Sequence, residues 1–97
     1  MLADANAHAI VYQVLDEVLA NGSVPAGARG AMFAVVDELR AATADADEVR
    51  RAERISIEMH KLEWALRQRD DAAIEAAHGQ LKALAAEWVN SRICSRH

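Results

Sequence analysis

Large apolar residues recur every three or four positions through four stretches of this chain, and no stretch alternates apolar with polar residues. That spacing is typical of one face of an α-helix, whereas alternation would indicate a half-buried β-strand. One proline and four glycines also provide little of the turn chemistry that an all-β fold requires. The pattern therefore predicts an all-α fold, a four-helix bundle-like single domain.

The 53% hydrophobic content overstates the size of the core, because 22 of the 97 residues are alanine. Alanine has the highest helix propensity and little surface to bury, so it favours helices that approach closely around a thin core. A chain of this length forms one domain, which we expect to span residues 1–97. The last residues, about 94–97, are expected to be disordered or vector-derived.

The first helix is predicted over about residues 4–20, with Asp4 as its N-cap. Gly22 ends it, because glycine takes the left-handed conformation that closes a helix C-terminus. The second helix is expected to open at Ser23, whose hydroxyl is a suitable cap, with Pro25 in its first turn. Its apolar pattern ends near residue 43.

The third helix, of roughly 22 residues, begins where Asp45 and Glu48 have the spacing of a capping box. Asp70 and Asp71 then interrupt the pattern and cap a fourth helix that runs to about Ile93. This join is short, so helices three and four are predicted to form an antiparallel hairpin. The core-facing stripes of the four helices are Ile10, Val11, Val14, Leu15, Val18 and Leu19; Met32, Val35, Val36 and Leu39; Ala52, Ile55, Met59, Leu62 and Leu66; and Ile74, Ala77, Leu81, Leu84 and Trp88.

The third helix carries a second stripe, Ile57, His60 and Trp64, roughly opposite parts of its core stripe. A surface helix of a bundle needs one apolar stripe. Either this helix is central and wrapped by helices one and four, or the second stripe is an interface with a partner. We expect an interface, in a homodimer or a partner groove, with His60 as a packed or interfacial residue.

The net charge of −4 is unevenly spread, with −6 on residues 1–49 and +2 on residues 50–97. The acidic half is either a solvated face or a surface that meets a basic partner. In the second case the chain is a small acidic inhibitor, of the kind that phages and mobile elements encode, that occupies a basic and possibly nucleic-acid-binding surface. Asp37 and Glu38 are the acids expected to make that contact. The negative charge and the 4% aromatic content disfavour direct nucleic-acid binding.

Glu75 and His78 have the i, i+3 spacing that carboxylate-bridged di-iron bundles place on two of their helices. A second copy of the motif is missing, so a site of this kind would need a dimer to complete it. A metal-binding half-bundle that uses these two residues is therefore a third hypothesis. The leading interpretation includes no metal and no cofactor.

No other motif indicates catalysis. The chain has no glycine-rich phosphate loop, no serine nucleophile motif and no zinc spacing, and its one cysteine, Cys94, lies near a helix end. No apolar run approaches the roughly 18 residues of a membrane span, and no signal-peptide pattern is present, so a cytoplasmic protein without a membrane partner is expected. The leading hypothesis is a non-enzymatic interaction or regulatory module that acts as a homodimer.

Overall fold

The computed structural model describes residues 2–42 and 46–94, and the side chains of residues 7–42 and 46–90. Every regular element in these ranges is a helix, which confirms the all-α prediction. Asp45, the expected cap of the third helix, lies outside the described residues, as do residues 95–97; the fourth helix reaches Cys94. The four helices are α1 (Leu2–Asn21), α2 (Ala28–Ala41), α3 (Ala46–Gln68) and α4 (Asp71–Cys94).

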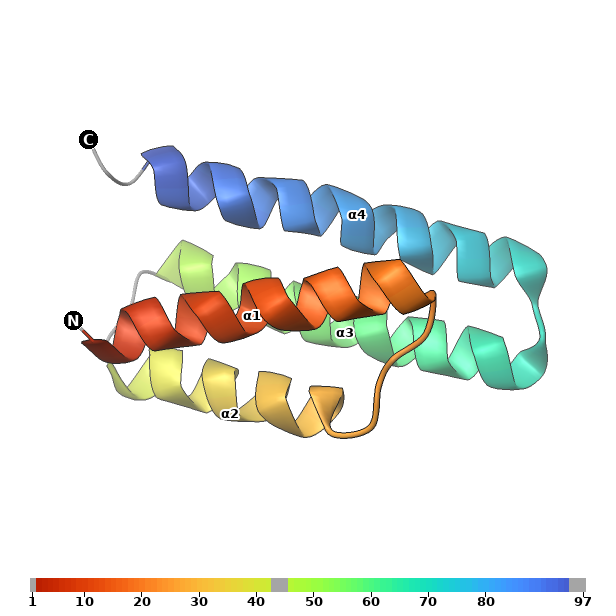
Figure 1. Cartoon of the computed structure of the whole chain (residues 1–97), viewed down its shortest axis with the longest axis horizontal. Coiled ribbons are helices and arrows are strands. Elements are labelled where there is room, and N and C mark those ends of the chain that lie inside the picture. Colours follow the sequence, from red (N-terminus) through yellow and green to blue (C-terminus); the bar gives the residue numbers. More distant parts are fainter. Residues whose placement is uncertain (1, 43–45, 95–97) are drawn as a thin grey trace.

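The helices form an up-down-up-down bundle of about 41 × 24 × 20 Å (Figure 1). Helix α1 packs against α2 and α4, and α3 packs against the same two helices. The most extensive contact joins α3 to α4, as predicted for the hairpin. The outer sides of α2 and α3 are therefore free of any other described helix.

The core confirms most of the predicted stripes. Ile10, Leu19, Leu66 and Ile74 are half-buried at its edge. Ala7, Ala28 and Ala65 are also buried, although no predicted stripe included them. The fully buried large side chains are Val11, Leu15, Val18, Met32, Val35, Leu39, Ile55, Met59, Leu62, Leu81, Leu84 and Trp88.

In the turn between α3 and α4, the predicted cap of the fourth helix is confirmed. Asp70 caps α4, since its Oδ1 accepts a hydrogen bond of 3.2 Å from the backbone N–H of Ala73. At the end of α3, Arg69 is in the left-handed region with φ 54°. The N–H of Asp70 donates to the Ala65 carbonyl (3.1 Å) and that of Arg69 to the Leu66 carbonyl (3.2 Å). This is a Schellman closure with arginine in the usual glycine position.

Two predicted helix starts are wrong. Helix α1 begins at Leu2, so Asp4 lies inside it and is not the cap. Helix α2 begins at Ala28, after both Ser23 and Pro25, and Gly27 stands at its N-cap without any side-chain hydrogen bond. The reason is the backbone of Gly27, whose φ of 86° breaks the helical path back toward Pro25.

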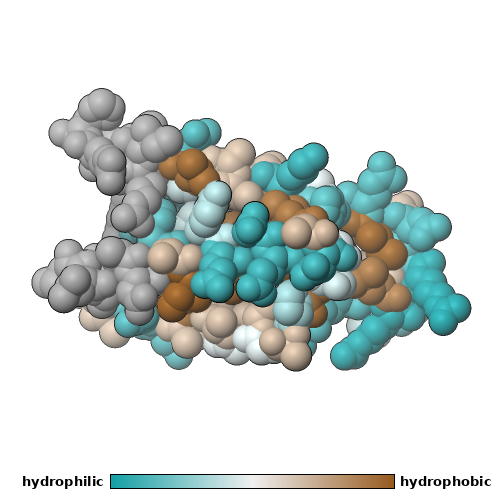
Figure 2. All heavy atoms as spheres, in the orientation of Figure 1, coloured by the Kyte–Doolittle hydropathy of each residue, from teal (hydrophilic) through white to brown (hydrophobic). Residues whose placement is uncertain are grey.

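The face of the bundle that Figure 2 shows carries both hydrophilic and hydrophobic areas. Hydrophilic side chains gather over α1, and hydrophobic areas appear in separate patches, chiefly where α1 meets α4 (Figure 2).

Candidate protein interface

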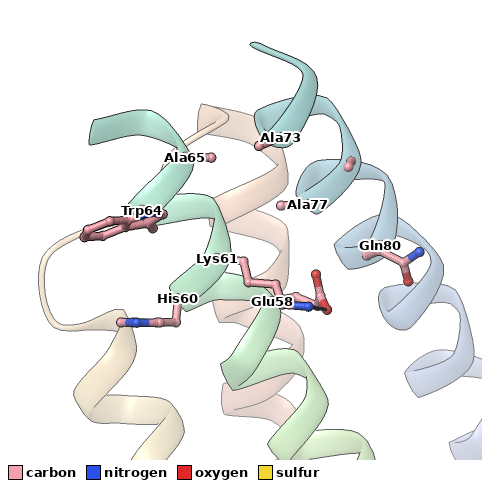
Figure 3. A pocket seen from close by; sticks show the side chains of 9 residues that line it. Glu58, His60, Lys61, Trp64, Ala65, Ala73, Ala77 and Gln80 are labelled. Carbon is pink, nitrogen blue, oxygen red and sulfur yellow. Dashed lines mark hydrogen bonds and ion pairs between the residues drawn. The ribbon is translucent and has the colours of Figure 1, made fainter. Parts of the chain in front are cut away.

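The predicted second stripe of α3 lies on the solvent side of the helix. Ile57 is 53% exposed, Trp64 is 58% exposed, and His60 is also exposed. His60 and Trp64 project from α3 on the same side, away from α4, whereas Lys61 points toward α4 (Figure 3). No described part of the chain covers this stripe, so α3 is not a central helix wrapped by its neighbours.

A groove of about 690 Å³ between α2 and α3 joins this stripe to a residue that the sequence reasoning missed, Phe33. Phe33 is 62% exposed, the highest value among the large hydrophobic residues described as exposed. It is the only phenylalanine and stands outside the core stripe of its helix, which is the signal that would have found it. The groove is lined by Arg29, Phe33, Val36, Asp37 and Arg40 from α2 and by Glu53, Ser56, Ile57, His60 and Lys61 from α3.

Two ion pairs between α2 and α3 mark the ends of this groove. Arg29 Nε lies 3.3 Å from Glu63 Oε1, an oxygen that is covered from solvent, and the Arg40 guanidinium contacts the Glu53 carboxylate. Both pairs are partly exposed, so each contributes little to stability on its own. Both pairs join α2 to α3, and they neutralise the charges at the two ends of the groove.

A second groove, of about 670 Å³, lies between α3 and α4 (Figure 3). Its α4 side is made of Ala73, Ala76, Ala77 and Gln80, and its α3 side includes Trp64. His60 and Lys61 line both grooves, so the two grooves adjoin along α3. Lys61 Nζ contacts Glu58 Oε2 at 3.2 Å. We call the exposed side chains of Phe33, Ile57, His60 and Trp64 the outer α3 face.

The two acids predicted to contact a basic partner, Asp37 and Glu38, lie in different surroundings in the structure. Asp37 and Glu38 are both exposed, but only Asp37 lines the α2–α3 groove. The structure thus brings Asp37 together with Ile57 and His60, two residues of the predicted interface. Asp37 has no ion pair or hydrogen bond with its side chain among the described residues.

Glu75 and His78, the pair proposed for metal binding, differ from each other in burial. Glu75 is exposed, whereas His78 is half-buried, with its Nε2 3.5 Å from the Leu19 carbonyl oxygen near the end of α1. Among the described side chains, those of residues 7–42 and 46–90, no group of three or more His, Cys, Asp or Glu is placed to hold a metal ion. Within this part of the chain, Glu75 and His78 have no further ligand beside them.

No helix in the described ranges is long and apolar enough to cross a membrane. No protein-family model, curated protein or solved structure shows a significant match to the chain. Its function is therefore inferred from its own surface.

Proposed function

We propose that the protein is a non-enzymatic interaction module that forms a homodimer through the outer α3 face. The observation that carries this proposal is the exposure of three large apolar side chains on two adjacent helices. Phe33, Ile57 and Trp64 are each more than half exposed. Exposed apolar clusters of this kind mark protein interaction sites.

The area of this cluster fits a modest dimer. The three side chains expose about 350 Å² together, given the surface areas usual for large apolar residues. A standard interface buries roughly 800 Å² per partner, of which a little over half is apolar. The cluster therefore supplies most of the apolar area of one such interface. This size is that of a standard interface and is below the range of obligate dimers, so it favours a reversible dimer.

The charges around the cluster support a second copy as the occupant. Arg29, Arg40 and Lys61 are each paired with a glutamate of the same chain. A face whose cations are already neutralised does not require a partner of strong opposite charge. An identical face meets that condition, and a twofold dimer presents the same patch from both subunits.

Light scattering on the wild-type protein and on Trp64→Glu tests the proposal. The wild type is expected to be a dimer, and the variant a monomer with unchanged helical circular dichroism. Tyr12→Glu is the matched control, because Tyr12 is 56% exposed but lies on α1. A wild type that stays monomeric at millimolar concentration would refute the homodimer. A folded, dimeric Trp64→Glu would place the interface elsewhere.

A second candidate function is the acidic inhibitor, which the position of Asp37 in the α2–α3 groove favours. In that case the protein is a monomer whose apolar face and carboxylate meet a basic protein surface. Binding would weaken steeply with salt, because exposed charges are screened within about 8 Å at physiological ionic strength. Capture of a host protein that resists 300 mM salt and tolerates Asp37→Asn with Glu38→Gln would exclude this function.

A further inference from the structure

We propose that two copies pack groove against groove about a twofold axis, so that Asp37 of each subunit pairs with His60 of the partner subunit. This inference rests on the proposed homodimer and adds its geometry and its regulation. Since the pair requires a protonated imidazole, the dimer is tighter in weakly acidic than in alkaline solution.

Among the residues that the structure describes, Asp37 and His60 are left without partners because the other charged residues of the groove are paired within the chain. The α2–α3 groove and its neighbour contain three cations, Arg29, Arg40 and Lys61, whose partners are Glu63, Glu53 and Glu58. From α4 the adjoining groove receives only the neutral Gln80 among polar residues. Within the described chain, Asp37 and His60 are the two titratable residues of the α2–α3 groove whose side chains lack an ion pair or a hydrogen bond.

The register of the groove places the two residues symmetrically. Its ends are the Arg29–Glu63 and Arg40–Glu53 pairs. Midway between them lie residue 58 on α3 and residues 34–35 on α2. His60 stands two residues toward the first pair, and Asp37 stands two to three residues toward the second. At a rise of about 1.5 Å per residue, each is about 3–4 Å from the middle.

Consider a twofold axis that passes through the middle of the groove, perpendicular to its length. This axis places His60 of the partner subunit level with Asp37, because the two residues lie on different helices at equal distances from the middle, toward opposite ends of the groove. The carboxylate of Asp37 then faces the imidazole of His60 of the partner subunit, and the reverse contact forms at the other side of the axis. Phe33 and Ile57 line the same groove, and by the same symmetry Phe33 of one subunit would face Ile57 of the partner subunit between the two charge pairs. The dimer would have an apolar contact at its axis with one charge pair on either side of it, each about 3–4 Å from the middle of the groove along the helices.

The sign of the pH response follows from this pairing. Aspartate is charged at all pH values above about 5, whereas a histidine side chain in water gains its charge below about pH 6.5. Both Asp37–His60 contacts are thus ion pairs in weak acid and weaken as the pH rises. Burial of His60 without an acid opposite it would have the opposite effect, because desolvation disfavours the imidazolium. The direction of the response therefore separates the two arrangements.

Sedimentation equilibrium at pH 6.0 and pH 8.0 measures this response. Two ion pairs, each of the strength usual between exposed groups, predict a dimer that is about tenfold tighter at pH 6.0. His60→Gln and Asp37→Asn should each remove the difference. Asp16→Asn, at an exposed position of α1, should keep it. A dimer that is equally tight at both pH values, or tighter at pH 8.0, would overturn the pairing while leaving the homodimer in place.

A charge exchange at pH 6.0 gives a second, independent test. Asp37→Lys alone and His60→Asp alone each create like charges across the axis, so both variants should be monomeric. Mixed in equal amounts they should form a heterodimer, because one contact is native and the other is a reversed ion pair. A mixture of Asp16→Lys with His60→Asp is the control: Asp16→Lys should dimerise with itself, as the wild type does, and His60→Asp should stay monomeric beside it. Failure of the mixture to associate, where the wild type dimerises, would refute this pairing alone; a monomeric wild type would refute the homodimer as well.

Discussion

The indole of Trp88 stacks on the imidazole of His8, with ring centroids 4.3 Å apart, and its Nε1 donates a 3.3 Å hydrogen bond to the His8 carbonyl oxygen. His8 Nε2 also lies 3.0 Å from Glu48 Oε1. One histidine therefore links α1 to both α3 and α4. Trp88 is 1% exposed and is the largest of the fully buried side chains.

Trp88→Phe is predicted to lower the free energy of unfolding by about 1–3 kcal/mol, through lost volume and the lost indole hydrogen bond. Urea unfolding followed by circular dichroism measures this, at a protein concentration low enough for the monomer. The same change at the other tryptophan, Trp64→Phe, is the control and should cost less than about 0.5 kcal/mol. Equal losses at the two positions would contradict the assignment of one buried and one exposed tryptophan.

Arg69→Gly is predicted to raise the free energy of unfolding by about 1 kcal/mol, because a residue with a Cβ pays for its left-handed conformation (φ 54°) and glycine does not. Thermal or urea unfolding measures the gain. Arg69→Ala separates the backbone effect from loss of the arginine side chain, and should leave the stability within about 0.5 kcal/mol of the wild type. A gain of the same size in both variants would refute the explanation from backbone strain.

Periodicity predicted the helices, the hairpin and most of the core, because burial of an apolar stripe depends on spacing alone. The prediction failed where the backbone conformation determines the position at which a helix begins. A serine followed by a proline suits a helix start, but the positive φ at Gly27 delays α2 to Ala28. Likewise, Ala65 is buried, but alanine also occurs at many exposed helix positions, so the residue type did not predict its burial.

The candidate interface was predictable in part. Ile57, His60 and Trp64 share one side of a single helix, so helical spacing alone brings them together. Phe33 and Asp37 join them only through the register of α2 on α3, which the Arg29–Glu63 and Arg40–Glu53 pairs describe. Such pairing between helices is a tertiary property, and the sequence spacing within either helix does not contain it.

Elemental analysis tests the metal hypothesis. We predict less than about 0.1 iron or zinc per chain in the purified protein, because a structural or catalytic site needs at least three protein ligands. His78→Gln should cost less than about 1 kcal/mol, since the half-buried ring makes one long contact with the Leu19 carbonyl. Metal at about one per chain or per dimer, lost on His78→Ala, would instead make Glu75 and His78 ligands.

The contrast between the two tryptophans also permits a direct test of the interface without any substitution. Trp88 is 1% exposed in the folded chain, so acrylamide quenching that changes with protein concentration reports on Trp64. At a fixed pH, we predict that the quenchable fraction of the fluorescence falls and the emission shifts to shorter wavelength as the concentration passes the dissociation constant. Trp64 then loses contact with water, which is the main source of its stabilisation of the dimer. Trp64→Phe should show blue, weakly quenched emission at all concentrations. Unchanged quenching across a range in which light scattering shows monomers becoming dimers would place Trp64 outside the interface.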